Sequence, residues 1–359
     1  MSARAPEARA PEARAKAART PAWARQRERG SSALLRVMLW ITLRLGWHAG
    51  AGLLYPIALW YYLASPGARA ASRDFLGRAR GRPARAREVY RHLLTFARVT
   101  LDRVFLLTDR VERFRVEVEG LEHLDALVRG GRGCVLLGGH LGSFEVLRSV
   151  AKRAPVPVRP LMFRRNAGAL TRLLEGMAPE VQRRVIDIGT PSAMLSAHEA
   201  VSRGEIVGIL ADRAPCGQRS AAVAFMGGRA EFPTGPIALA ATLGAPVVLF
   251  FGVRTGRRRY AVRFEPFAER VVLRRESRQA DLAEWVGRFA ARLEARAREH
   301  PENWFNFFPF WKEPADATPV ARPRAARGWP VRRVPLRPAG AASPGGTVAR
   351  PDGAAGAGA

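Results

Sequence analysis

Hydrophobic residues first gather near the N-terminus, between Ala33 and Ala64. Residues 45–64 are twenty consecutive positions without Asp, Glu, Lys or Arg, about the length that crosses a hydrocarbon core of ~30 Å. Aromatic residues in this run suit a membrane interface, but arginines flank both sides, so the positive-inside rule gives no orientation. A membrane anchor, spanning or half-inserted, is the first interpretation. A buried amphipathic helix hairpin is the second, and a cleaved signal peptide is the third.

The pattern then becomes that of a folded domain. Apolar residues at 89, 93, 97, 101 and 104 predict one face of a helix. Alternation over 114–118 predicts a strand, and 121–129 a short helix. From residue 134, apolar strands alternate with helices, which predicts an α/β fold with a mixed central sheet flanked by helices. The predicted strands are 134–139, 156–163, 183–189, 205–212, 245–255 and 258–267, and the predicted helices start near 143 or cover 166–177, 190–204, 235–244 and 280–300.

Both ends of the chain are low in large apolar residues. Residues 1–30 repeat "APEAR", and residues 315–359 are rich in Pro, Ala, Arg and Gly, so both are predicted to be disordered. The predicted organisation is a basic leader (1–30), a membrane-anchor segment (31–66), a folded domain (67–314) and a tail (315–359). Deleting the leader should leave activity intact.

The formal net charge is +28, of which +17 remains when residues 1–30 and 317–359 are set aside. A folded region with this positive charge is attracted to phospholipid headgroups, acidic carrier proteins or nucleic acid. An arginine-rich proteome is the alternative explanation for the tails. Nucleic-acid binding is disfavoured because the aromatic segments look membrane-directed rather than like base-stacking platforms. Cys134 and Cys216 show no metal spacing and are interpreted as small core or site-lining residues, with a single disulfide as the alternative.

The stretch "GGHLGSFE" follows the apolar run "CVLLGG" and carries the first candidate chemistry. His140 lies where the predicted strand ends, the place where sites gather in α/β sheets. His140 and Glu145 can meet only if the histidine lies in a turn before a helix and Glu145 in its first turn. Glycines at 138, 139 and 142 permit such a turn.

An imidazole is the usual general base, and a carboxylate on its other nitrogen fixes the tautomer. The chain has no G-x-S-x-G motif, so the base is expected to activate a hydroxyl of the substrate. A buried, hydrogen-bonded structural histidine is the alternative. No metal and no cofactor are expected.

Further stretches of the chain resemble the lipid A biosynthesis acyltransferases, the lauroyl/myristoyl transferase branch of the lysophospholipid acyltransferase superfamily. Together they span roughly residues 35–312. The matching stretches are "ASRDFLGRA" (71–79), "FARVTLDR" (96–103), "GGHLGSFE", "MFRRN" (162–166) and the run from "LADR" to "GAPVV" (210–248).

The resemblance implies a glycerolipid-acyltransferase-like fold and an enzyme of lipopolysaccharide biosynthesis on the cytoplasmic face of a bacterial inner membrane. It would move an acyl chain from acyl carrier protein or acyl-CoA to a lipid hydroxyl. His140 takes the general-base role and Glu145 that of its partner. Arg164 and Asp212 match substrate-site positions, and Arg213 is a candidate phosphate contact.

One part of the first block departs from the family pattern. Typical lipid A members carry "H-F-G-N-W-E"-like residues, whereas this chain has Leu141, Ser143 and Phe144. That variant looks more like acyltransferases of other lipid or polyene pathways. The acceptor is therefore open between a lipid A precursor and another lipid or polyene.

Overall fold

The computed structural model describes residues 32–108, 110–151, 157–163, 173, 176–213, 218–311 and 333–335. The predicted leader, the predicted helix at 166–177 apart from three residues, and most of the predicted tail lie outside these ranges.

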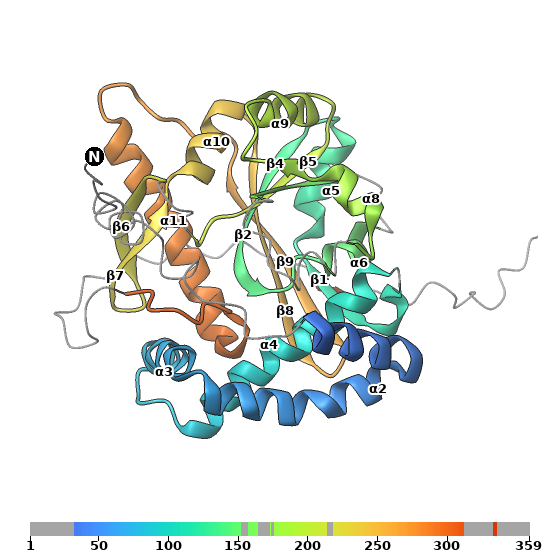
Figure 1. The fold of residues 1–359 in the computed structure, drawn as a ribbon. Coiled ribbons are helices and arrows are strands. Elements are labelled where there is room, and N and C mark those ends of the chain that lie inside the picture. The colour runs from blue at the N-terminus through green and yellow to red at the C-terminus, as the bar shows by residue number, and fades with distance from the viewer. Residues whose placement is uncertain are drawn as a thin grey trace, which may run out of the picture.

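The centre of the molecule is an eight-stranded sheet in the order β10-β1-β9-β8-β2-β5-β3-β4 (Figure 1). Its strands are β1 (Arg115–Glu119), β2 (Cys134–Gly142), β3 (Val158–Met162), β4 (Ile186–Asp187), β5 (Ile206–Leu210), β8 (Val247–Gly256), β9 (Arg259–Ala268) and β10 (Arg333–Pro335).

The sheet is mixed, as predicted. Strands β8, β2, β5, β3 and β4 pair in parallel, whereas β8 and β9 form an antiparallel pair joined by a tight turn. Its central strands are apolar on both sides: Val135 and Leu137 contribute to one core cluster, Leu136 to the other. Such strands must be covered on both faces, which accounts for the helices flanking the sheet.

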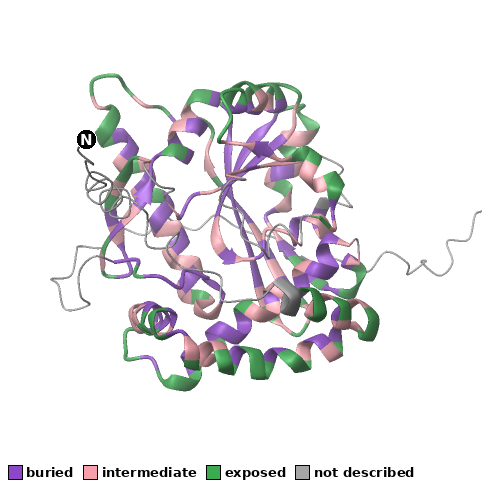
Figure 2. Cartoon of the chain, in the orientation of Figure 1, coloured by how far each residue is buried: buried purple, intermediate pink, exposed green. Residues whose placement is uncertain are grey.

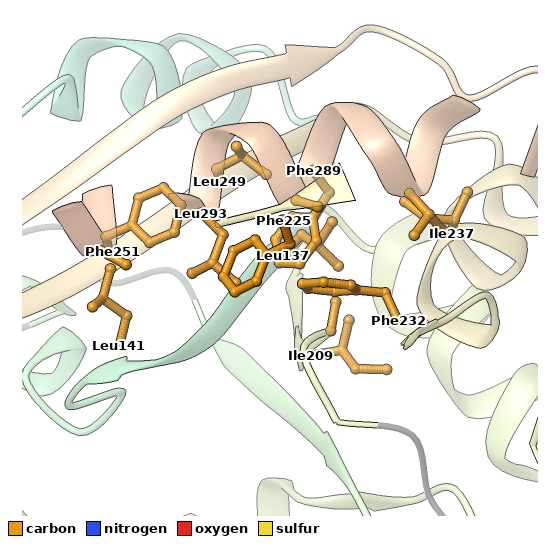
Figure 3. Close-up of a cluster of buried hydrophobic side chains, with 14 of the residues drawn as sticks. Leu137, Leu141, Ile209, Phe225, Phe232, Ile237, Leu249, Phe251, Phe289 and Leu293 are labelled. Carbon is orange, nitrogen blue, oxygen red and sulfur yellow. The ribbon is translucent and has the colours of Figure 1, made fainter. Parts of the chain in front are cut away.

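One face of the sheet is covered by α9 (Ala193–Ser202), α10 (Gly235–Leu243) and α11 (Arg278–Glu299), together with the hairpin β6 (Ser220–Phe225) and β7 (Gly228–Pro233). Helix α11 buries the face predicted from its sequence, including Phe289 and Leu293. Figure 3 shows these two side chains in one buried cluster with Leu137, Leu249 and Phe251 of the sheet.

Helices α4 (Ala86–Leu107), α5 (Leu121–Arg129), α6 (Leu147–Ala151) and α8 (Pro179–Arg184) pack on the opposite face. Helix α3 (Pro66–Arg80) joins α2 (Ser32–Ala64) to α4, and single 3₁₀ turns lie at η1 (Val111–Arg113) and η3 (Pro301–Asn303). In Figure 2 the strands between these layers are buried along most of their length.

Helix α2 (Ser32–Ala64) lies along α4, with a kink at Gly46 (Figure 1). Trp47, Leu54 and Ala58 face the body and are buried. The indole nitrogen of Trp47 donates to Asp102 of α4 at 2.7 Å. Among the described residues, 36–64 form the one helix that is long and apolar enough to cross a membrane by length and composition. Its exposed large apolar residues are Val37, Trp40, Leu45, Leu53, Tyr55, Ile57, Leu59, Trp60 and Leu63.

Most predicted strands and helices are present, with several differences; of the predicted strand 183–189, only Ile186–Asp187 is a strand, and residues 183 and 184 belong to α8. Strand β2 continues through His140 to Gly142, and the next helix begins only at Leu147 rather than near 143. The hairpin β6–β7 was not predicted, because its alternation is short and interrupted by small residues. In the predicted tail, Arg333–Pro335 pairs with β1 as β10, since β1 would otherwise be an uncovered edge strand.

Candidate active site

His140 and Asp212 meet because their strands are neighbours. Strands β2 and β5 are parallel, with Gly138 opposite Leu210. His140 comes two residues after the first and Asp212 two residues after the second, so both lie at the carboxyl ends of their strands. This is the edge where sites form in α/β sheets. The Nδ1 atom of His140 is 2.7 Å from Oδ1 of Asp212.

Asp212 is fully buried and accepts four hydrogen bonds. Besides the His140 ring, its Oδ2 atom accepts the backbone N–H of His140 at 2.9 Å. The same oxygen accepts the Trp304 indole N–H at 3.1 Å and the Asn306 amide at 2.9 Å. A buried carboxylate with this many donors is held in one orientation. It can therefore fix the orientation of the imidazole ring.

The surroundings set the charges of the pair. Burial would raise the pKa of Asp212, but the positive charge that the His140 ring carries when protonated, the hydrogen bonds from His140 and the charge of Arg213 outweigh burial and lower that pKa well below its usual value. Because Asp212 is ionised, Nδ1 of His140 must be the protonated nitrogen, which leaves the lone pair on Nε2. Partial burial lowers the pKa of His140, Arg213 acts in the same direction, and Asp212 opposes both. The ring is 28% exposed, its lowered pKa favours the neutral imidazole, and no hydrogen bond from the described residues occupies Nε2.

A glycine ends the strand and sets the turn that follows. Gly142 has a φ of 79°, and a β-carbon there would lie 1.9 Å from the carbonyl oxygen of Gly252. Both the positive φ and the close approach to β8 require glycine. The chain can therefore turn sharply immediately beyond His140 and Leu141.

Glu145 is not the partner of His140, so that prediction is wrong. Glu145 lies in the turn before α6, where its Oε1 is 2.6 Å from Nη2 of Arg103 and its Oε2 accepts the Ser143 hydroxyl at 2.8 Å. The physical reason is that β2 extends through His140. The histidine therefore points to the neighbouring strand end rather than along the turn. Glu145 instead ties the turn to α4.

Of the other predicted site residues, the structure describes Arg213 but not Arg164. Arg213 follows Asp212, and its guanidinium donates to the Asn306 side chain and the Phe305 carbonyl, each at 2.6 Å. Burial lowers its pKa to about 10, so it stays charged beside the dyad. Arg164 lies outside the described residues, as does Cys216, whereas Cys134 is a buried free thiol of β2.

Sequence reasoning missed three contributors to the site. Trp304 and Asn306 hold Asp212, and Arg103 holds Glu145. The aromatic run from Trp304 to Trp311 packs in the core. The available signal for the His140–Asp212 pair was that each residue directly follows an apolar run, 134–139 and 206–211.

Comparison with known proteins identifies a family for this chain. No curated protein matches the chain. A match to the family described as "Bacterial lipid A biosynthesis acyltransferase" covers residues 86–313. That stretch is more than half of the chain and contains His140, Glu145 and Asp212. The chain therefore belongs to the bacterial lipid A biosynthesis acyltransferase family.

Proposed function

We propose that this acyltransferase uses His140 as a general base, oriented by Asp212, to transfer a fatty acyl chain to a hydroxyl of a lipid acceptor. The observation that carries the proposal is the 2.7 Å contact between His140 Nδ1 and Asp212 at the ends of adjacent parallel strands. It leaves Nε2 with a lone pair, as a general base requires. Among the described residues, no hydrogen bond to Nε2 competes for it.

The reaction would then proceed without a covalent enzyme intermediate. Nε2 of His140 takes the proton of the acceptor hydroxyl as its oxygen attacks the thioester carbonyl carbon. The new C–O bond forms a tetrahedral oxyanion, which collapses as the C–S bond breaks. The departing thiolate takes the proton back from the imidazolium. Asp212 remains ionised and stabilises the imidazolium while it exists.

The donor is proposed to be acyl carrier protein or acyl-CoA, and the acceptor a lipid A precursor or related lipid. Both donors are anionic, and the positive charge of the chain, +28 in total, favours their approach. Arg213 is a proposed substrate contact because its charged guanidinium lies beside the dyad. Arg164 remains a predicted one. Glu145 is proposed to act in catalysis by positioning the turn after His140.

Membrane attachment is proposed to run through α2, as a half-inserted helix rather than a spanning one. One face of α2 packs on α4, and the other exposes large apolar and aromatic residues such as Trp40, Leu59 and Trp60. A helix with one face covered by protein and one apolar face open is suited to lie in the membrane interface. The catalytic domain, residues 67–314, would then lie on the cytoplasmic face of the inner membrane.

Lipid mass spectrometry tests the function in cells. A deletion strain should contain one lipid that lacks the mass of one acyl chain, and the wild-type gene should restore it. A gene encoding His140→Ala, expressed to the same level in the membrane fraction, should not. Restoration by His140→Ala would contradict the general-base role, and an unchanged lipid profile in the deletion strain would contradict the proposed reaction.

A further inference from the structure

A cavity of about 490 Å³ lies between α2, α4 and the end of the β8–β9 hairpin. It does not include His140 or Asp212. Four arginines line it: Arg91 and Arg98 from α4, and Arg254 and Arg257 from the hairpin. A single carboxylate, Glu302, lines it as well. The cavity is therefore strongly cationic.

Two of the four arginines pair with carboxylates, one of which, Glu302, also pairs with Arg80 at 3.4 Å. Arg254 pairs with the buried Asp102 at 3.3 Å, and Arg91 with Glu302 at 3.6 Å. Within the ranges that the structure describes, Arg98 and Arg257 form no ion pair with a carboxylate. The cavity thus keeps two positive charges that no carboxylate of the described part of the chain balances.

Aromatic rings of α2 hold these two guanidiniums. Arg98 lies over the Tyr55 ring at 5.2 Å and donates to its hydroxyl at 2.7 Å. Arg257 lies over the Trp47 ring at 5.4 Å and contacts the His48 ring at 3.0 Å. A guanidinium stacked on a ring keeps most of its N–H donors for an anion. Its planar fork matches the oxygens of a phosphate.

The cavity is placed between the proposed membrane face and the catalytic pair. Tyr55 lines it and is also 50% exposed among the apolar residues of α2. On the inner side, Asn303 lines it and exchanges hydrogen bonds with the backbone of Arg254. The next residue, Trp304, donates to Asp212. A headgroup in the cavity would therefore lie at the membrane surface. The adjacent residues Asn303, which lines the cavity, and Trp304, which contacts Asp212, would link it to the site.

We propose that this cavity binds the phosphate group of a lipid headgroup through Arg98 and Arg257. The inference rests on the proposed membrane function, because it takes the ligand from the bilayer in which α2 would lie. The phosphate belongs either to an anionic phospholipid of the bilayer or to the phosphorylated acceptor. A free phosphate ion would make the same contacts, and the experiment below distinguishes it from the two lipid sources.

The test compares two double variants of the full chain with equal loss of charge. Arg98→Gln/Arg257→Gln removes the unbalanced guanidiniums. The control Arg275→Gln/Arg278→Gln changes two exposed arginines, one shortly before α11 and one at its first position. The 22 residues of α11 span about 33 Å, and the far end of the helix leads to Glu302 of the cavity. The two control arginines therefore lie far from the cavity. Thermal melts establish that each variant folds. The single variants Arg98→Gln and Arg257→Gln repeat the comparison if the double variant does not fold.

Vesicle flotation without acceptor provides the first readout. For vesicles containing phosphatidylglycerol, affinity should fall about tenfold or more in Arg98→Gln/Arg257→Gln and no more than about twofold in the control. Binding to phosphatidylcholine vesicles should not change. The second readout is the KM for a phosphorylated acceptor in phosphatidylcholine vesicles. A higher KM with unchanged flotation would assign the phosphate to the acceptor and also support the proposal.

Equal losses in both double variants, or no loss in either readout, would overturn the proposal. So would a thermal shift by inorganic phosphate that only Arg98→Gln/Arg257→Gln loses while both lipid readouts stay unchanged. His140→Ala should bind vesicles as the wild type does, so a failure of the catalytic proposal leaves this test intact. If the wild-type chain binds no vesicle, the membrane proposal fails, and the acceptor KM still tests the cavity.

Discussion

Replacing Asp212 by asparagine tests how the histidine is oriented. Oδ2 of Asp212 accepts three donors, and Oδ1 accepts only Nδ1 of His140. An asparagine should place its single oxygen at the three-donor position, because each buried donor left without a partner costs about 1–3 kcal/mol. Its NH₂ group then faces Nδ1 and forces the neutral ring to carry its proton on Nε2. The base loses its lone pair at the reacting nitrogen.

The expected loss in kcat is large. In a serine protease, the equivalent change to the wrong tautomer lowers kcat about 10⁴-fold, or about 5.5 kcal/mol in the activation free energy. We expect a loss of this order for Asp212→Asn, with KM changed much less, because Asp212 acts through the tautomer of the histidine rather than on the substrate. Acyl transfer from a radiolabelled donor to a lipid acceptor in detergent micelles measures both constants.

Glu145→Gln is the matched control, since it removes a carboxylate of the same sequence block. Glu145 contacts Arg103 and Ser143 rather than the histidine, and glutamine keeps its length and one acceptor oxygen. Its loss in kcat should be no more than about tenfold. A folded Asp212→Asn enzyme within tenfold of wild type, or Glu145→Gln falling as far as Asp212→Asn, would refute the assignment of Asp212 as the orienting carboxylate.

Three further predictions concern pH and stability. Because a base must be neutral and burial lowers the pKa of His140 below its usual 6.5, kcat/KM should fall only as the pH drops below 6.5; a pH–rate profile with its acid limb above pH 7 would contradict this. Gly142→Ala should prevent folding or lower the melting temperature sharply, because its β-carbon would lie 1.9 Å from Gly252 oxygen; an unchanged thermal melt would contradict the strand ending. Asp102→Ala should cost about 3–5 kcal/mol in the free energy of unfolding, because it leaves Arg254, 8% exposed, as an unpaired buried charge; a loss below 1 kcal/mol in denaturant titration would show that the pair is dispensable.

Local patterns in the sequence predicted much of the fold. The alternation of strands and helices predicted the mixed sheet, and the apolar face of 280–300 predicted how α11 packs. Periodicity reports which side of an element is buried, and this information is local. It did not report that β2 runs on through His140, because glycine and histidine carry no strand signal. This one extension directs the histidine to Asp212 instead of Glu145.

Contacts between distant segments could not be predicted in this way. Trp304 and Asn306 reach Asp212 from the far end of the chain, and the pairing of β2 with β5 depends on a strand order that no single segment encodes. The length and composition of α2 were clear from the sequence, but its packing on α4 was not. That packing depends on Trp47 meeting the buried Asp102, 55 residues away.

The central claim is that His140 is the base for acyl transfer to a lipid hydroxyl, and one measurement tests it most directly. Purified wild-type enzyme and His140→Ala are incubated with acyl donor and a lipid A precursor in micelles, and the acceptor is analysed by mass spectrometry over time. Wild type should add the mass of one acyl chain, and a folded His140→Ala enzyme should add none above the uncatalysed rate. Transfer by His140→Ala at near the wild-type rate would contradict the account.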